Sequence, residues 1–361
     1  MDRVYNFSAG PATLPIEVLQ EVGEEWLDFQ GLGMSVVEIS HRSQAYKALN
    51  AEVEARFKSL LGLGDGYRVL FLQGGATTQF GMIPLNFLPD GGSADYVLTG
   101  NWSVKAQEDA DRIGQTRVAA SSAEAFRYIP PASEQSYDPD AAYVHITSNN
   151  TIYGTQFHEW PSVGDRPLVA DMSSDILCRP IPAEDFALIY AGAQKNIGPA
   201  GATIVVIRES WLEKRVDRNL PVMFDYRTHI KKDSAYNTPP VFTIYMINLV
   251  LKWIEGLGGL AAMAQRNQKK AATVYEAIDR SGGFYSGYVR PEDRSLMNVT
   301  FTLPDDEVTA KFIAEAGKEG LVNLKGYRSL GGIRASIYNA MPQAGVERLA
   351  DFMDRFASDN G

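Results

Sequence analysis

The sequence predicts an α/β fold: a large domain with a mainly parallel, seven-stranded sheet sandwiched by helices, and a smaller C-terminal α/β domain. Seven short runs rich in apolar and β-branched residues lie between positions 67 and 208, a pattern typical of strands. Helical patterns separate several of these runs, and such alternation indicates a parallel sheet covered on both faces. The chain has 361 residues, of which 45% are apolar, so it can form more than one core.

The expected strands are continuous apolar runs, as burial on both faces requires. They read YRVLFLQ (67–73), ADYVLTG (94–100), QTRVAAS (115–121), AAYVHITS (141–148), RPLVADMS (166–173), FALIYAGA (186–193) and GATIVVIR (201–208).

Helices are expected on either side of the first strand and near position 250. The first covers 44–63, where apolar residues recur at spacings of three and four: Tyr46, Leu49, Val53, Phe57 and Leu60. The second covers TTQFGMIPLNFL (77–88). The apolar segment VFTIYMINLVLKWI (241–254) is shorter than a membrane span of ~20 residues and includes Thr243, Asn248 and Lys252. We therefore expect a buried helix there and no membrane association.

The sequence GLGG at 256–259 predicts a domain boundary, because glycines break helices. A further helix is expected at 261–280. The tail then alternates strand and helix on a smaller scale: LMNVTFTL (296–303), EVTAKFIAEAGKEG (307–320), IRASIYNA (333–340) and VERLADFMDRFA (346–357). We expect a large domain over 16–257 and a small domain formed by 1–15 and 258–361.

Composition argues against several classes of function. The formal charge of −10 leaves no basic stripe for nucleic acid. The single cysteine, Cys178, cannot form an intramolecular disulfide, and the four histidines never occur at metal-ligand spacing, so no metal site is expected. The first fifteen residues lack the apolar core of a signal peptide, and we expect a cytoplasmic protein.

Four features directly follow expected strands, where open parallel sheets bind ligands. GGATT (74–78) precedes a helix and offers amides for a phosphate, although such turns are also common as plain connections. Trp102 could stack on a ring or pack in the core. Asp171 could act on a ligand or cap the next turn. Lys195 follows the buried run ALIYAGA, where lysine is uncommon.

Pyridoxal phosphate needs all four features. Its aldehyde requires an amine, which Lys195 supplies, and its ring nitrogen requires an anion, which Asp171 supplies. Trp102 would face the ring, and GGATT would give amide donors to the phosphate. The sequence therefore predicts a pyridoxal-phosphate enzyme.

The chain also resembles the phosphoserine aminotransferases, class V aminotransferases of the aspartate-aminotransferase-like fold type I. The resemblance runs nearly end to end through NFSAGP (6–11), EISHRS (38–43), FLQGGA (71–76), NWS (101–103), ADMSSDIL (170–177), YAGAQKNIGPAG (190–201), NTPP (237–240) and GGIRASIYNAM (331–341). It implies transfer of an amino group from L-glutamate to 3-phosphohydroxypyruvate, giving O-phospho-L-serine and 2-oxoglutarate in serine biosynthesis. It is equally compatible with 4-phosphohydroxy-L-threonine in vitamin B6 synthesis.

The resemblance implies a role for each site residue. Lys195 is the Schiff-base lysine, Asp171 the partner of the ring nitrogen and Trp102 the stacking ring. The further cofactor contacts that it implies are Ala76, Thr77 and Gln194 at the phosphate, Thr151 beside the ring hydroxyl, and Asn237 and Thr238 from the neighbouring subunit. The substrate contacts that it implies are His41 and Arg42 from the neighbouring subunit, Arg328 and Arg334. A homodimer with shared active sites follows.

Three residues depart from those that many or some family members carry: Tyr327 stands for histidine, Thr77 for arginine and Ala9 for serine. Other functions compete with the resemblance. A nicotinamide dehydrogenase would need GxGxxG, which GGATTQ does not match. A cysteine desulfurase would need a mobile cysteine, an alanine-glyoxylate-type aminotransferase would share the fold, and a non-catalytic binding protein could dispense with Lys195 or Arg334.

Overall fold

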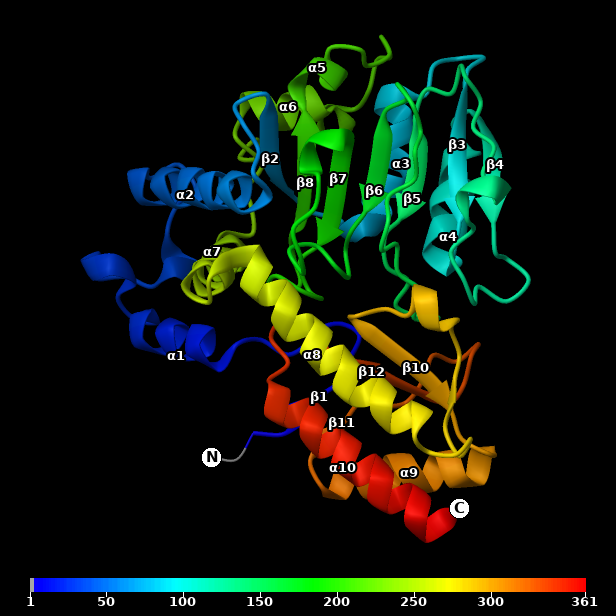
Figure 1. The fold of residues 1–361 in the computed structure, drawn as a ribbon. Coiled ribbons are helices and arrows are strands. Elements are labelled where there is room, and N and C mark those ends of the chain that lie inside the picture. The colour runs from blue at the N-terminus through cyan, green and yellow to red at the C-terminus, as the bar shows by residue number, and fades with distance from the viewer. Residues whose placement is uncertain (1–2) are drawn as a thin grey trace.

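The computed structural model describes residues 3–361 and contains a seven-stranded sheet between helices, with a smaller unit below it in Figure 1. The strand order is β2-β8-β7-β6-β5-β3-β4. The strands are β2 (Tyr67–Leu72), β3 (Ser93–Leu98), β4 (Gln115–Ser121), β5 (Val144–Thr147), β6 (Leu168–Asp171), β7 (Phe186–Gly192) and β8 (Thr203–Arg208). All seven predicted strands are present, and the predicted fold class is confirmed.

The sheet is parallel except at β8, which pairs antiparallel with both β2 and β7. The strands β3 to β7 are parallel to one another. Their carboxyl ends therefore share one edge, where Asp171 of β6 lies opposite Tyr190 of β7. This register brings Asp171 close to the turn that follows Gly192.

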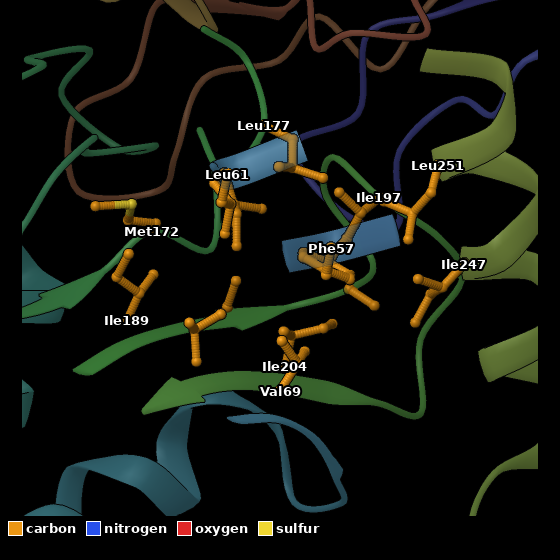
Figure 2. Packing of buried hydrophobic residues seen from close by; sticks show 14 of the residues in the cluster. Phe57, Leu61, Val69, Met172, Leu177, Ile189, Ile197, Ile204, Ile247 and Leu251 are labelled. Atoms are coloured by element: carbon orange, nitrogen blue, oxygen red, sulfur yellow. The ribbon is translucent and has the colours of Figure 1, made fainter. Parts of the chain in front are cut away.

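Helices cover both faces of the sheet. On one face α2 (Gln44–Leu61) and α7 (Val241–Gly256) pack against the strands, and Figure 2 shows Phe57, Val69, Ile204 and Ile247 meeting there. On the other face lie α3 (Gly75–Phe87), α4 (Asn101–Ala110), α5 (Glu209–Leu212) and α6 (Tyr226–Lys231). The helix α7 is buried, as predicted, and no single helix among residues 3–361 is long and apolar enough to span a membrane.

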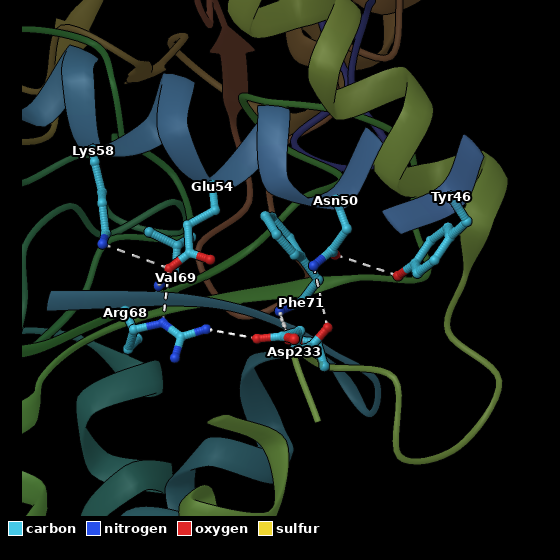
Figure 3. A network of polar contacts seen from close by, with 9 residues as sticks. Tyr46, Asn50, Glu54, Lys58, Arg68, Val69, Phe71 and Asp233 are labelled. Atoms are coloured by element: carbon cyan, nitrogen blue, oxygen red, sulfur yellow. Dashed lines mark hydrogen bonds and ion pairs between the residues drawn. The ribbon is translucent and has the colours of Figure 1, made fainter. Parts of the chain in front are cut away.

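The edge strand β2 has one side without a neighbouring strand, and a polar network of side chains hydrogen-bonds to that side (Figure 3). The same network binds the segment around position 234. Glu54 of α2 accepts hydrogen bonds from Arg68 Nε at 3.0 Å and from the Val69 amide at 3.2 Å. The Phe71 amide donates to Ser234 Oγ at 2.9 Å. Because these side chains pair the free edge of the strand, they fix the path of the chain from Ser234 toward 237.

The smaller unit has two small sheets and three long helices. The strand β10 (Asn298–Thr302) pairs antiparallel with β9 (Ser286–Gly287) and β12 (Ile333–Ser336), and β1 (Tyr5–Asn6) pairs parallel with β11 (Leu321–Val322). The helices are α8 (Gly259–Asp279), α9 (Asp306–Lys318) and α10 (Gln343–Asn360). The sequence did not predict the two-residue strands β1, β9 and β11, nor the helices α4 and α1 (Ile16–Glu25).

The smaller unit also has its own apolar core, which combines Phe7 with residues from 271 to 356. The chain bends by 84° between α7 and α8, at the predicted boundary. The division into a domain of 16–257 and a domain of 1–15 with 258–361 stays a prediction, which this separate core supports. The strand predicted at 333–340 ends at Ser336, and the next three carbonyls accept hydrogen bonds from Lys270 instead.

Candidate active site

Lys195 lies in the turn that follows β7, at the edge where the parallel strands end. The amides of Ile197 and Gly198 close this turn by donating to the carbonyl of Ala193. The lysine side chain is half-buried, and its Nζ lies 5.7 Å from the ring centroid of Trp102. Burial lowers the pKa of Lys195, although the negative charge of Asp171 opposes this shift. Lys195 is therefore closer to the neutral amine than a solvated lysine at the same pH.

Asp171 ends β6, and its carboxylate is buried. The amide of Ser173 donates to its Oδ1 at 2.9 Å. Burial raises the pKa of Asp171, while the charge of Lys195 and hydrogen bonds from Ser173 lower it. Ser173 Oγ also accepts a hydrogen bond from the Gly192 amide at 3.1 Å. One serine thus joins the ends of β6 and β7 and fixes the carboxylate relative to the lysine turn.

Trp102 and Arg334 meet at Thr151, in the loop after β5. Trp102 Nε1 donates to Thr151 Oγ1 at 3.3 Å, and Arg334 Nη1 donates to the Thr151 carbonyl at 3.2 Å. The arginine belongs to β12, so this contact joins the smaller unit to the large sheet. The Tyr327 ring centroid lies 5.9 Å from Arg334 Cζ, which places the residue that departs from the family histidine beside the arginine.

The turn GGATT begins α3 and faces the end of β7. Gly74 and Gly75 have φ angles of 96° and 69°, values that favour glycine. The first amides of a helix have no acceptor within the helix, and the helix dipole favours an anion there. A Cβ placed on Gly192 would lie 4.0 Å from the Ala76 nitrogen, so the start of α3 lies close to the end of β7, near Lys195 and Asp171.

Two other predicted cofactor residues lie beside this site in the same chain. A Cβ placed on Gly10 would lie 3.3 Å from Lys195 Cγ and 3.8 Å from Gln194 Cγ, so the N-terminal segment packs over the lysine turn. Asn237 Nδ2 donates to Gln73 Oε1, next to the glycine turn. Thr77 and Thr238 are exposed. The cofactor roles of Ala76, Thr77, Gln194, Asn237 and Thr238 stay predictions.

The structure does not bring the predicted substrate cluster together within one chain. Among residues 3–361, the side chains of His41, Arg42 and Arg328 make no ion pair or hydrogen bond, and only the Arg42 backbone amide donates, to Ser40 Oγ at 3.2 Å. Arg42 and Arg328 are exposed, and His41 lies in the turn before α2. Their roles stay predictions.

A second buried acid lies beside Asp171, and the sequence did not single it out. Asp175 accepts hydrogen bonds from Ser148 Oγ and from Gln156 Nε2, the latter at 3.1 Å. Burial raises its pKa to about 6. The motif ADMSSD contains this residue, but spacing alone does not separate a buried acid from an exposed one.

Cys178 lies close to this acid and is buried. Burial raises the pKa of its thiol, which keeps the sulfur protonated and unreactive. In the described part of the chain, no group of three or more His, Cys, Asp or Glu side chains could hold a metal ion.

Comparison with known proteins leads to one family. The family Aminotransferase class-V matches residues 4–349. A phosphoserine aminotransferase of Geobacillus kaustophilus is 57% identical over 357 residues, 99% of this chain and 99% of that protein. The solved structure of phosphoserine aminotransferase from Bacillus circulans subsp. alkalophilus is 51% identical, with a TM-score of 0.98 over 100% of each chain. The pyridoxal-phosphate-bound enzyme from Trichomonas vaginalis is 40% identical, with a TM-score of 0.93 over 98% of this chain and 100% of that chain. The chain therefore belongs to the class-V aminotransferase family and, within it, to the phosphoserine aminotransferases.

Proposed function

We propose that this chain transfers the amino group of L-glutamate to 3-phosphohydroxypyruvate with pyridoxal phosphate as cofactor, giving O-phospho-L-serine and 2-oxoglutarate. The observation that carries the proposal is the convergence of Lys195, Asp171, Trp102 and Arg334 at one edge of the sheet. The full-length identity to phosphoserine aminotransferases supports this substrate pair.

The residues present fit pyridoxal phosphate. The absence of a side chain at Gly192 leaves space between Ser173 Oγ and the Ala76 amide, at 3.9 and 4.0 Å from where its Cβ would lie. The first turn of α3 would hold the phosphate, Asp171 the ring nitrogen and Trp102 the ring face. When bound, the cofactor supplies an aldehyde that takes up the amino group and a conjugated ring that accepts electrons.

Lys195 is the residue that holds and moves the proton at the substrate α-carbon. A general base must be unprotonated when it acts, and the lowered pKa of Lys195 increases the fraction of neutral amine at neutral pH. Burial raises the pKa of Asp171, and a nearby positive charge such as that of Lys195 opposes this rise. A protonated ring nitrogen would supply the same positive charge.

Arg334 binds the substrate α-carboxylate. Its guanidinium is half-buried, has no carboxylate partner among residues 3–361 and contacts Thr151 on the floor of the site. Burial lowers its pKa, but arginine still stays charged at any working pH. Two parallel N–H groups can therefore fix the carboxylate and with it the direction of the α-carbon.

A homodimer with shared active sites is part of the proposal. Five large apolar side chains between α1 and α2 are at least 43% exposed: Trp26, Leu27, Leu32, Met34 and Val37. Such exposure favours contact with another protein, and a second copy would cover these residues. His41 and Arg42 come four and five residues after Val37 and would then approach the partner's active site. A monomer in analytical ultracentrifugation at assay concentration would contradict this arrangement.

A cytoplasmic location also stays a proposal. The single cysteine is buried and unpaired, which fits a reducing compartment.

The proposed reaction is tested by supplying the purified enzyme and pyridoxal phosphate with glutamate and 3-phosphohydroxypyruvate. Phosphorus NMR should detect phosphoserine, and its formation should depend on both substrates. Sulfide release from cysteine and glycine formation from alanine and glyoxylate serve as the competing assays. A higher kcat/KM in either competing assay would overturn the proposal; the buried thiol of Cys178 argues against the desulfurase.

Selection of the phosphate by Arg328 is tested with Arg328→Met and the control Lys325→Met, an exposed cation three residues earlier in the same loop. A phosphate carries about 1.5 to 2 charges against about one for the side-chain carboxylate of glutamate. Arg328→Met should therefore lower kcat/KM more for phosphoserine than for glutamate, and Lys325→Met should leave their ratio unchanged. Equal losses for both amino donors would remove Arg328 from the phosphate site.

A further inference from the structure

Four buried polar side chains form a cluster between the two units of the chain, behind the candidate active site. They are Asn196 in the lysine turn, Asn267 and Lys270 on α8, and Asn339 after β12, and each is at most 5% exposed. We call them the interdomain cluster. The helix α8 contributes apolar residues to the core of the large sheet near its start and to the core of the smaller unit near its end, so it connects the two.

Lys270 is buried, and it has no acidic partner among residues 3–361. Its Nζ donates to three successive carbonyls, those of Ile337 at 2.9 Å, Tyr338 at 2.6 Å and Asn339 at 3.4 Å. A buried amino group is costly unless it is hydrogen-bonded, and here three carbonyls surround Nζ as acceptors. The three carbonyls directly follow β12, the strand that carries Arg334. Lys270 therefore fixes the backbone at the exit of that strand.

Asn339 connects the exit of β12 to the lysine turn. Its backbone amide donates to Asn196 Oδ1 at 2.9 Å. Asn196 Nδ2 in turn donates to the carbonyl of Ile176 at 2.6 Å. Asn196 directly follows Lys195 in the chain. The residue next to the catalytic lysine is thus held between the smaller unit and the segment that follows Asp171.

Asn267 and the Asn339 side chain also bind the segment that follows Asp171. Asn267 Nδ2 donates to Asn339 Oδ1 at 2.8 Å and to the Cys178 carbonyl at 2.9 Å. Asn339 Nδ2 donates to the Leu177 carbonyl at 2.9 Å. The segments that follow Asp171, Lys195 and Arg334 therefore all end in one set of hydrogen bonds.

We propose that the interdomain cluster is a positioning device that sets the distance between Arg334 and Lys195. This inference rests on the proposed function. The α-carboxylate on Arg334 is one bond from the α-carbon whose proton Lys195 moves, so the spacing of the two residues decides whether that proton is within reach. Misplacement of reacting groups by about 1 Å can cost about a hundredfold in rate. A methionine in place of Lys270 would fill a similar volume without desolvating a charge, so what the lysine adds is the fixed position of three carbonyls.

The test compares Lys270→Met with Lys269→Met in the holoenzyme. Lys269 is the preceding residue of α8 and is exposed, so its replacement controls for the loss of a positive charge. The probe is glutarate, which has the two carboxylates of glutamate but no amino group, and its affinity is measured by titration calorimetry. We expect Lys270→Met to weaken glutarate binding about tenfold and Lys269→Met to leave it within about twofold.

A double-mutant cycle with Arg334→Met separates positioning from general destabilisation. If Lys270 acts through Arg334, Lys270→Met should weaken glutarate binding much less in the Arg334→Met background than in the wild type. Additive effects would overturn the inference. The inference would also be overturned if Lys270→Met melts at a lower temperature but binds glutarate as tightly as the wild type.

A second variant covers the case in which Lys270→Met does not fold. Asn267→Ala keeps the lysine and removes the two hydrogen bonds to Asn339 and Cys178. Asn267→Ala should also weaken glutarate binding, and it should do so much less in the Arg334→Met background. Unchanged glutarate binding in Asn267→Ala would overturn the inference. Because glutarate binding does not require turnover, a protein that binds glutarate through Arg334 but makes no phosphoserine would refute the proposed function and leave this inference standing.

Discussion

Lys270 should make the stability of the cofactor-free protein rise with pH on the alkaline side of neutrality. Burial, and to a smaller extent the nearby charge of Arg266, lowers the pKa of Lys270 to about 7, whereas an unfolded lysine titrates near ~10.4. Between these values the unfolded chain binds a proton that the folded chain does not bind. The stabilisation is therefore complete above ~10.4 and is lost as the pH falls toward the folded pKa.

The expected size of the effect follows from one proton. Each pH unit inside the window changes the free energy of unfolding by about 1.4 kcal/mol. The three carbonyls around Nζ favour the ammonium, so they raise the lower end of the pH range over which the unfolded chain alone holds the proton. The free energies of unfolding are therefore best compared between about pH 8 and about pH 9.5. Over this range the wild type should gain about 2 kcal/mol relative to Lys270→Met.

Urea unfolding of the cofactor-free protein at both pH values measures this difference. Lys195 also has a lowered pKa, but it contributes equally to the wild type and to Lys270→Met, so subtraction removes it. Because Lys269 is exposed, the free energy of unfolding of Lys269→Met should change with pH as it does in the wild type. If the free energies of unfolding of the wild type and Lys270→Met depend on pH in the same way, Lys270 is not a buried amine in solution.

Three further predictions concern the site and its support. Asp171→Asn should lower turnover by far more than about tenfold, or ~1.4 kcal/mol, because a neutral partner no longer keeps the ring nitrogen protonated; steady-state kinetics measure this, and a smaller loss would place the anion elsewhere. Lys195→Ala should abolish amino transfer while equilibrium dialysis still detects cofactor binding, and full activity would refute its role. A Cβ at Gly198 would lie 2.9 Å from Ile247 Cγ1, whereas one at Gly256 would meet nothing within 4 Å. Calorimetry should therefore show Gly198→Ala to be destabilised by about 1–3 kcal/mol and Gly256→Ala not to be, and equal melting temperatures would contradict this.

The strands of the large sheet could be predicted because burial on both faces makes each of them a continuous apolar run. Such a run carries no information about direction, and β8 was not distinguished from its parallel neighbours. The connection could have revealed it. Only residues 193–202 separate β7 from β8, and a crossover between parallel strands needs a dozen residues or more. The short connection is the turn that carries Lys195, so the antiparallel strand holds the lysine at the end of β7.

The chemical groups of the site could be predicted for a related reason. Asp171 ends β6, Lys195 and the glycine turn follow β7 and β2 within a few residues, and parallel strands bring such positions to one edge. Arg334 comes from a different sheet, and only its resemblance to the family indicated its role. Of the residues expected from a neighbouring subunit, Asn237 also lies near the glycine turn of its own chain. A single chain does not show which subunit His41, Arg42 and Thr238 would serve.

The distances between those groups depend on residues that no local pattern marks. Lys269 and Lys270 are adjacent in QRNQKKAAT, and both look like part of a solvated helix face. The structure exposes the first and buries the second, because α8 turns that side toward the exit of β12. The carbonyls that Lys270 binds are more than sixty residues away in the chain, and Asn196 lies 143 residues from Asn339. A sequence can therefore identify candidate side chains for the chemistry, whereas the contacts between the segments that carry Arg334 and Lys195 exist only once both units have folded against α8.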